Sequence, residues 1–369
     1  MNIKRLVRKN VSSLSAYSAQ EIPCRIKLDA NESPYGVEDV LNAVKGIDTN
    51  RYPDPEAKTL KKLLAKGLRV RQENILQGNG SDELIYYLIT TFGGPVLYPV
   101  PTFSMYGIIS QALGEKKIEI PLDKEFDLDI DKILSAIKSN KPKLIFLSSP
   151  NNPTGNCFSS DRILKIIEIC RGIVVVDEAY QPFTSEKGFL PLLNDYKNLV
   201  IMRTLSKIGL AALRLGFIIA DPGIIEEVNK VRLPFNVNSL SQAVAISAFM
   251  DRKKLDQSIK SIMSERERLL KEMGKINGIK PFPSEANFIL FRVNSPDVIY
   301  KAMLKKGILV RNLNNVVKGC LRVTVGTPDE NTVFLKELKN ITNQLHEVDS
   351  LRRQDEKIQG RKKDKRNRY

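Results

Sequence analysis

Short β-branched segments alternate with longer amphipathic segments through the middle of this 369-residue chain. Near-continuous apolar runs are typical of strands that are buried on both faces of a parallel sheet, and helices must connect such strands. The pattern therefore predicts an α/β fold with a mainly parallel sheet, in which ligand groups gather at the carboxyl ends of the strands. The clearest strand candidates are Leu144–Ser149, Ile173–Glu178, Leu199–Thr204 and Leu215–Ala220.

The pattern changes near Asp251, where a highly charged helix leads into shorter elements. These are a strand-like segment NFILFRV, a helix ending in KKGILVRN and a second strand CLRVTVG. We therefore expect a large domain over residues 46–250 and a smaller α+β domain over 251–345. The irregular first 45 residues are expected to wrap onto the smaller domain as an N-terminal arm.

The net charge of +16 is uneven, because residues 351–369 carry nine Lys or Arg against three acids. Residues 346–369 are predicted to form a basic, disordered tail that has almost no apolar side chains. Such a tail could bind nucleic acid, but a solvated extension is the favoured interpretation. No apolar run is long enough to span a membrane, and residues 1–10 lack the apolar stretch of a signal peptide, so we expect a soluble, cytoplasmic protein.

Cysteine and histidine usage excludes several kinds of active site. The four cysteines lie far apart in the sequence, without a C-x-x-C pair, so neither a zinc site nor a disulfide framework is expected. The single histidine, His346, stands beside the charged tail. This excludes a Ser-His-Asp hydrolase and a Cys-His protease. Acid-base chemistry must then depend on lysine, carboxylates, tyrosine or a cofactor, and no metal is predicted.

Three polar residues, Asn152, Asp177 and Lys207, follow predicted strands at intervals of about one βα unit. A carboxylate such as Asp177 is costly to bury without a cationic partner, and a protonated pyridine nitrogen would be such a partner. Tyr180 and Asn152 could both reach the phenolic oxygen of the same ring. Lys207 could form an imine with a cofactor aldehyde if its amine is neutral, which burial or a nearby cation such as Arg214 would favour. The freed amine could then act as a general base.

A phosphate group would need fixed donors, and the segment QGNGSDELIYYLIT offers them. The chain passes through Gly80 into a helix with Ser81 as the predicted N-cap, which leaves the N–H groups of Ser81 and Asp82 free. Ser206 and Arg214 would complete this anion site, and Phe103 is a candidate to stack on the ring. Singly, an Asp before a helix is usually a cap, and an Asn-Pro-Thr-Gly segment is usually a turn. Together these positions predict pyridoxal 5'-phosphate as the cofactor.

The motifs carry a resemblance that extends from about Leu14 to Ile341. In order, LDANESPYG, NRYPDP, GNGSDE, SPNNPTG, VDEAY, RTLSKIGLAALRLGF, EANFILFR and GCLRVTVG resemble segments of fold-type I aminotransferases, and among them of the histidinol-phosphate aminotransferase family. The resemblance implies a large domain with a seven-stranded sheet, pyridoxal phosphate as cofactor, and amino-group transfer between histidinol phosphate and 2-oxoglutarate. The loop from Lys207 to Arg214 is one residue shorter than in aminotransferases generally, and the tail has no counterpart.

The same resemblance implies roles that spacing alone does not show. Tyr52 matches a tyrosine that reaches the cofactor phosphate of a neighbouring subunit, so a homodimer with shared active sites is implied. Arg322 matches the arginine that holds the acidic group of the substrate. Arg311 and Tyr17 match positions that help to bind the substrate phosphate.

Three alternatives stay open at this point. A related aromatic amino acid aminotransferase or a threonine-phosphate decarboxylase would keep Lys207, Asp177 and Arg214. A non-catalytic regulator that binds nucleic acid through the basic tail belongs to a different class. The intact Lys, Asp and Arg argue against it, because such a protein has no physical need for a buried lysine beside an arginine.

Overall fold

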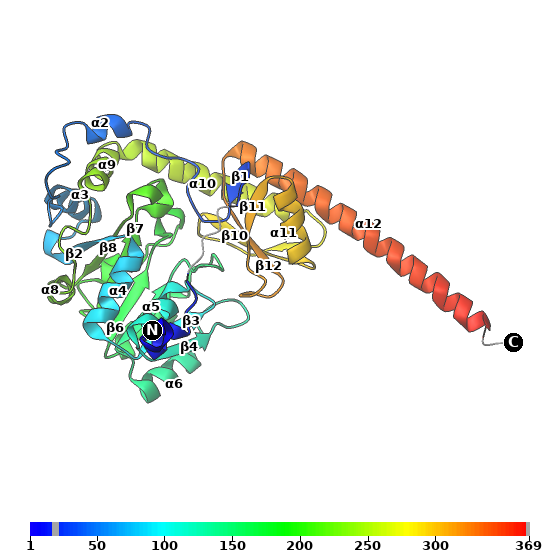
Figure 1. Cartoon of the computed structure of the whole chain (residues 1–369), viewed down its shortest axis with the longest axis horizontal. Coiled ribbons are helices and arrows are strands. Elements are labelled where there is room, and N and C mark those ends of the chain that lie inside the picture. Colours follow the sequence, from blue (N-terminus) through cyan, green and yellow to red (C-terminus); the bar gives the residue numbers. More distant parts are fainter. Residues whose placement is uncertain (17–21, 367–369) are drawn as a thin grey trace.

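A seven-stranded sheet forms the centre of the larger of two lobes (Figure 1). The computed structural model describes residues 1–16 and 22–366, with side chains through Glu347. Six of the seven strands point in the same direction, five of them beside parallel neighbours, as the sequence predicts, and buried apolar side chains fill their interiors. In spatial order the strands are β2 (Ile75–Asn79), β8 (Leu215–Ala220), β7 (Leu199–Thr204), β6 (Ile173–Asp177), β5 (Leu144–Ser148), β3 (Val96–Val100) and β4 (Lys117–Pro121).

Helices cover both faces of this sheet, because alternate strand residues face opposite apolar layers. One layer lies under α3 (Lys58–Leu68), α6 (Ile130–Asn140), α7 (Ser160–Ile169) and α9 (Ser239–Met250). The other lies under α4 (Ser81–Phe92), α5 (Met105–Leu113) and α8 (Pro222–Asn229). This three-layer arrangement confirms the predicted α/β class.

Strand β8 departs from the parallel pattern, since it pairs antiparallel with both β7 and β2. The reason is the short connection over residues 205–214, which contains only the 3₁₀ turns η5 (Ser206–Ile208) and η6 (Ala211–Leu213). A parallel crossover needs about a dozen or more residues and usually a helix. The remaining 3₁₀ helices of the described residues are η1 (Ile3–Arg5), η2 (Gln72–Asn74), η3 (Gln181–Phe183) and η4 (Leu190–Leu192).

The small lobe is built on a mixed five-stranded sheet with its own apolar core. Helix α10 leads from the large lobe into it, and α11 and α12 also pack in this lobe. The strands, in spatial order, are β1 (Ile26–Leu28), β11 (Ile308–Asn312), β12 (Cys320–Thr324), β10 (Phe288–Val293) and β9 (Ile279–Pro281), and the helices are α10 (Arg252–Met273), α11 (Pro296–Lys305) and α12 (Pro328–Arg366).

The predicted helix ending in KKGILVRN is wrong in its last residues. Helix α11 ends at Lys305, and Ile308–Asn312 form strand β11. Gly307 separates the two elements with φ of 74°. Glycine adopts this left-handed conformation without a steric penalty and therefore ends helices readily.

The N-terminal residues do not all lie on the small lobe. Besides β1, which joins the small sheet, the segment contains α1 (Lys9–Ser12) and α2 (Val40–Val44). Asn10 Nδ2 donates to the carbonyl oxygens of Gln111 at 2.9 Å and Ala112 at 2.8 Å, so α1 lies against α5 of the large lobe. The prediction that the whole segment wraps onto the small lobe is wrong here, because Asn10 satisfies carbonyl groups near the C-terminus of α5.

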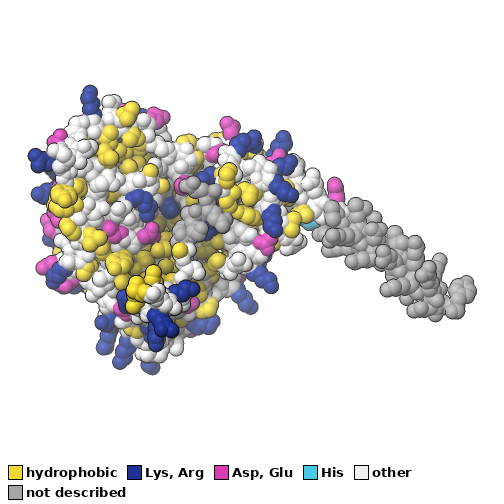
Figure 2. Space-filling view, in the orientation of Figure 1, with side chains coloured by type: hydrophobic (Ala, Val, Ile, Leu, Met, Phe, Trp, Pro, Cys, Tyr) yellow, Lys and Arg dark blue, Asp and Glu magenta, His cyan; other side chains and the backbone are white. Residues whose placement is uncertain are grey.

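The structure also differs from the predicted disorder of the basic tail. Helix α12 continues without a break to Arg366 and extends away from the small lobe (Figure 1). Residues 346–369 contain no proline and are rich in Lys, Arg, Glu and Gln, which have high helix propensity. Within the described residues, no helix is long and apolar enough to cross a membrane. On the face shown in Figure 2, described Lys and Arg side chains are spread over both lobes.

Candidate active site

The carboxyl ends of β5, β6 and β7 bring the predicted residues to one edge of the large sheet. Asp177 is the last residue of β6 and pairs with Ser148 of β5, and Asn152 lies in the loop that follows β5. Lys207 lies in η5, directly after β7. Since the three strands are adjacent and parallel, their C-terminal loops meet at this edge.

Asp177 is a buried carboxylate whose exposed fraction is 3%. Burial raises the pKa of Asp177 to about 6, although hydrogen bonds from the Tyr106 hydroxyl and the Ala179 amide oppose this effect. Tyr106 Oη donates to Oδ2 at 2.6 Å, and the Ala179 N–H donates to Oδ1 at 3.0 Å. The charge of Lys207 also lowers the pKa of Asp177. The two direct donors are neutral, so Asp177 remains a site suited to a cation.

Lys207 is half-buried, and its Nζ lies 5.7 Å from the ring centroid of Tyr180. Among the residues that the structure describes, Lys207 has no hydrogen bond or ion pair. An amine that no carboxylate holds is free to react with an electrophile, provided that it is deprotonated. Lys207 therefore has the surroundings of a reactive lysine.

Residues from the N-terminal segment approach the same edge of the sheet. Asn31 Nδ2 donates to the hydroxyl of Tyr180 at 2.9 Å, which leaves the Tyr180 O–H able to donate to another group. Asn31 is 2% exposed and has φ of 55°. Sequence reasoning did not single out Asn31 or Tyr106. The LDANESPYG motif contained Asn31, but nothing in the sequence placed it beside Tyr180.

The turn between β2 and α4 has the geometry of the anion cradle that the sequence predicts. Gly80 is the helix N-cap, with φ of 81°, and no side chain caps the helix. The prediction of Ser81 as N-cap is wrong by one residue, because only glycine adopts this backbone conformation readily. A Cβ on Gly80 would lie 2.6 Å from Nη2 of Arg214, and a Cβ on Gly216 of β8 would lie 2.8 Å from the Ser81 nitrogen. Sequence reasoning missed Gly216, which allows β8 to approach the helix start.

Arg214 stands at this helix N-terminus with φ of 51° and pairs with Asp82 at 3.2 Å. Both side chains are about half exposed, so this ion pair contributes little to stability and the guanidinium can turn to another anion. Ser206 is buried, and its Oγ accepts from Thr204 Oγ1 at 3.0 Å. The cradle thus combines uncapped N–H groups with one cation.

Arg322 of β12 is buried and points toward the loop after β5. It donates to Oδ1 of Asn152 at 2.5 Å and to the carbonyl of Asp29 at 2.8 Å, and its guanidinium lies over the Phe288 ring. Asn152 is thus engaged with Arg322 in this structure. Arg311 of β11 is exposed and directly opposite Arg322 across the antiparallel pair, so both arginines project from the same face.

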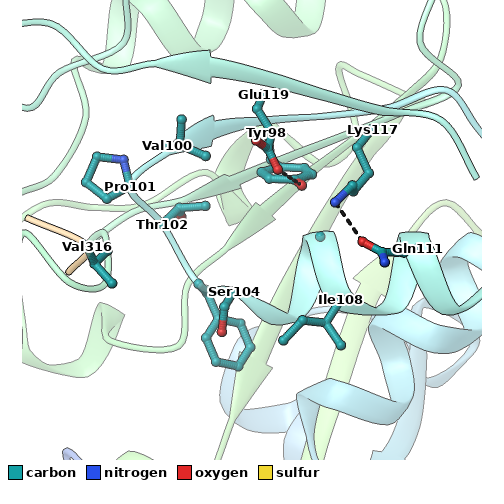
Figure 3. A pocket seen from close by; sticks show the side chains of 12 residues that line it. Tyr98, Val100, Pro101, Thr102, Ser104, Ile108, Gln111, Lys117, Glu119 and Val316 are labelled. Carbon is teal, nitrogen blue, oxygen red and sulfur yellow. Dashed lines mark hydrogen bonds between the residues drawn. The ribbon is translucent and has the colours of Figure 1, made fainter. Parts of the chain in front are cut away.

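The other predicted residues lie in different surroundings. Tyr52 is 81% exposed and stacks on Phe235 with 4.6 Å between ring centroids. Phe103 makes an edge contact with Tyr106 at 5.6 Å. Phe103 also lines a cavity of about 490 Å³ beside α5, which none of Asp177, Lys207 or Arg214 lines (Figure 3). The reactive and charged groups converge instead at the strand ends. Tyr17 lies outside the described residues.

The arrangement fits pyridoxal phosphate. The buried carboxylate of Asp177 would hold a protonated ring nitrogen, the uncapped turn at Gly80 with Arg214 would hold a phosphate, and Lys207 at the same strand ends would supply an amine for the aldehyde. Side chains at positions 80 or 216 would fill the cradle. No cluster of His, Cys, Asp and Glu that could bind a metal ion is found within the part of the chain that the structure describes.

Comparison with known proteins agrees with this geometry. The model of the family described as "Aminotransferase class I and II" matches residues 24–338. The chain belongs to the class I and II aminotransferases. A histidinol-phosphate aminotransferase from Caldanaerobacter subterraneus subsp. tengcongensis is 40% identical over 350 residues, covering 92% of this aminotransferase and 99% of the relative.

Solved structures show the same fold as this aminotransferase. The crystal structure of the histidinol-phosphate aminotransferase from Clostridium acetobutylicum matches with a TM-score of 0.80 and 26% identity, covering 86% of this chain and 99% of that one. The enzyme of that name from Sinorhizobium meliloti, solved in complex with pyridoxal-5'-phosphate, matches with a TM-score of 0.83 and 24% identity over 92% of this chain and 98% of that one. These likenesses confirm the predicted fold-type I architecture.

Proposed function

We propose that this aminotransferase transfers an amino group reversibly between L-histidinol phosphate and 2-oxoglutarate, giving imidazole acetol phosphate and L-glutamate in histidine biosynthesis. The observation that carries the proposal is the convergence of Asp177, Lys207 and the Gly80 turn at one sheet edge. Pyridoxal 5'-phosphate is the cofactor that this set of groups fits. Similarity to histidinol-phosphate aminotransferases over most of the chain supports the substrate.

In this proposal Asp177 holds the ring nitrogen, and Tyr180 and Asn152 donate to the phenolic oxygen. Phe103 covers one face of the ring. When bound, the protonated pyridine withdraws electrons from the reacting carbon, which is the chemistry that amino-group transfer requires. The phosphate is held at the cradle by Gly80, Ser81, Asp82, Ser206 and Arg214, and the Tyr52 side chain comes from a neighbouring subunit.

Lys207 has two roles in the proposal. It anchors the cofactor before substrate arrives, and its released amine then moves a proton at the substrate α-carbon. Its half-buried position without a carboxylate partner among the described residues supports this role, because an ion pair would hold the amine in its charged form. One side chain thus serves as anchor and base.

The substrate lies between the two lobes in this proposal, with residues 46–250 as the cofactor-binding domain and residues 1–45 and 251–345 as the smaller domain. Arg322 holds the acidic group, and Arg311 and Tyr17 assist with the substrate phosphate. The shared face of the two arginines supports an anionic substrate with a charge away from the reacting carbon.

A homodimer is part of the same proposal. Tyr52 is too exposed to serve as a core residue, yet stacking on Phe235 holds its ring in place. Leu233, close to Phe235 in sequence, is 63% exposed. Exposed aromatic and aliphatic side chains gathered in one segment are typical of a protein interface. The proposal also includes a cytoplasmic location, and no nucleic acid or membrane partner.

An absorbance titration of the purified protein with histidinol phosphate tests cofactor and substrate together. The expected result is a coloured protein whose visible absorbance changes with added histidinol phosphate and returns with 2-oxoglutarate. A panel of amino donors follows. Strong turnover of phenylalanine without turnover of histidinol phosphate would contradict the substrate, and carbon dioxide release from threonine phosphate would contradict the reaction type.

Arg322→Ala is expected to raise the Michaelis constants of both substrates by roughly 10- to 100-fold, because a charge-assisted hydrogen bond is lost from a buried site. Steady-state kinetics measure this effect. Arg292→Ala is the matched control, since Arg292 on neighbouring β10 also lies over a phenylalanine ring, that of Phe282, but is exposed. Unchanged Michaelis constants in the Arg322 variant would refute the substrate role.

A further inference from the structure

Tyr106 is a buried tyrosine whose hydroxyl reaches into the active site from helix α5. Its exposed fraction is 0%. The ring is stacked on Phe146, with 4.8 Å between centroids and an interplanar angle of 13°, and Phe103 meets it edge-on at 5.6 Å. These contacts leave the ring little freedom, so the packing holds its hydroxyl oxygen beside Asp177.

The hydroxyl of Tyr106 donates to one oxygen of Asp177 and leaves other acceptor positions of this carboxylate open. Oδ2 accepts from Tyr106 at 2.6 Å, and Oδ1 accepts from the Ala179 amide at 3.0 Å. Each carboxylate oxygen has two acceptor positions, so one on each oxygen remains for a further donor. Burial and the neighbouring Asp177 hold the pKa of Tyr106 well above its usual value, and the tyrosine therefore stays a proton donor.

We propose that Tyr106 is a positioning residue that orients the Asp177 carboxylate toward the cofactor's ring nitrogen and keeps that carboxylate ionised, so that the proton stays on the ring. This inference rests on the proposed cofactor. A neutral donor suits the task, because it lowers the proton affinity of a carboxylate without cancelling its charge. An arginine or lysine in the same place would replace the cation that Asp177 must attract.

A second tyrosine provides an internal comparison. Tyr98 is 3% exposed and belongs to the same apolar cluster, with its ring 6.2 Å from that of Tyr106. Its hydroxyl donates to Oε1 of Glu119 at 2.7 Å, as Figure 3 shows. Glu119 lines the cavity beside α5, which Asp177 does not line. Tyr98→Phe therefore removes a tyrosine hydroxyl from the same apolar cluster, but this hydroxyl donates to Glu119 and not to Asp177.

The test measures cofactor binding by the apoprotein rather than turnover. Pyridoxal phosphate is titrated into the unmodified protein, Tyr106→Phe and Tyr98→Phe, and absorbance gives the dissociation constant at a series of pH values. Tyr106→Phe is expected to weaken binding by about tenfold, the effect of one charge-assisted hydrogen bond. Tyr98→Phe is expected to stay within about twofold of the unmodified protein.

The pH dependence separates positioning from packing. Burial raises the pKa of Asp177 to about 6, and the Tyr106 hydrogen bond opposes this rise. Loss of the hydroxyl should raise that pKa further. Because the ionised carboxylate binds the ring cation, affinity falls as the pH drops through the pKa of Asp177. As the pH is lowered, cofactor affinity should therefore begin to fall at a higher pH in Tyr106→Phe than in the unmodified protein. In Tyr98→Phe it should begin to fall at the same pH as in the unmodified protein.

A double-mutant cycle completes the experiment. If Tyr106 acts through Asp177, adding Tyr106→Phe to Asp177→Asn should change cofactor affinity by less than about twofold. Equal effects of Tyr106→Phe in both backgrounds, or the same loss and pH profile in Tyr98→Phe, would overturn the inference. Failure of the unmodified protein to bind pyridoxal phosphate would instead overturn the proposed function.

Discussion

Replacement of Lys207 by Ala is expected to abolish turnover while the protein stays folded. The side chain would supply both the covalent anchor and the base of the proposed reaction, and loss of a general base alone lowers rates by about 10²–10⁴-fold. The visible absorbance of the bound cofactor should change as well. Because Lys207 has no hydrogen bond or ion pair with the described residues, the free energy of unfolding of the cofactor-free protein should change by less than about 1 kcal/mol.

Lys207→Arg is the control for charge. Arginine keeps the positive charge beside Asp177 but cannot become a neutral amine at accessible pH. We expect this variant to be as inactive as Lys207→Ala in single-turnover measurements with histidinol phosphate. Near-normal turnover in either variant would refute the assignment, and activity in the arginine variant alone would mean that Lys207 contributes only charge.

The parts of the site that follow the strand pattern could be predicted from sequence. Asp177 and Lys207 lie where the apolar runs before them end, and the carboxyl ends of parallel strands converge in any such sheet. Glycine before a polar helix start likewise predicted the turn at Gly80. The orientation of β8 was not predictable from its own residues, since a parallel strand and a fully buried antiparallel strand have the same apolar pattern.

The residues that sequence reasoning missed act across elements that are distant in the chain. Tyr106 has the apolar-face position of an ordinary core residue on α5, and only the packing of α5 against the sheet brings its hydroxyl to Asp177. Asn31 meets Tyr180 because the N-terminal segment passes between the lobes. Gly216 is required by the approach of α4 to β8, which no local pattern encodes. Each depends on tertiary contacts rather than on periodicity.

Asp177→Asn is expected to lower turnover by about 10²–10³-fold, the effect of removing one preorganised charge from an active site. A neutral amide cannot stabilise the positive ring nitrogen, so the proton-transfer step at the substrate α-carbon should slow most. A larger isotope effect with α-deuterated donor would measure this. A variant with unchanged turnover and an unchanged isotope effect would contradict the assignment of Asp177 to the ring nitrogen.

Asp177→Asn should lower turnover but raise the stability of the cofactor-free protein. Burial raises the pKa of Asp177 from 3.8 to about 6, so the folded state binds this proton more tightly than the unfolded state. The contribution of Asp177 to the free energy of unfolding is therefore most favourable below pH 3.8, where the carboxyl is protonated in both states. This contribution is lost as the pH rises to about 6. With about 1.4 kcal/mol for each pH unit, the ionised carboxylate destabilises the apoprotein by up to about 3 kcal/mol at neutral pH.

Asparagine at position 177 avoids this destabilisation, and its side-chain amide can accept from the Ala179 N–H and donate to the oxygen of Tyr106. Urea unfolding of the cofactor-free proteins at pH 7 should therefore show a higher midpoint for Asp177→Asn, and the difference should shrink as the pH is lowered toward 4. A lower midpoint at pH 7 would mean that the carboxylate is already compensated without a cofactor, and that Asp177 is not held in readiness for a cation.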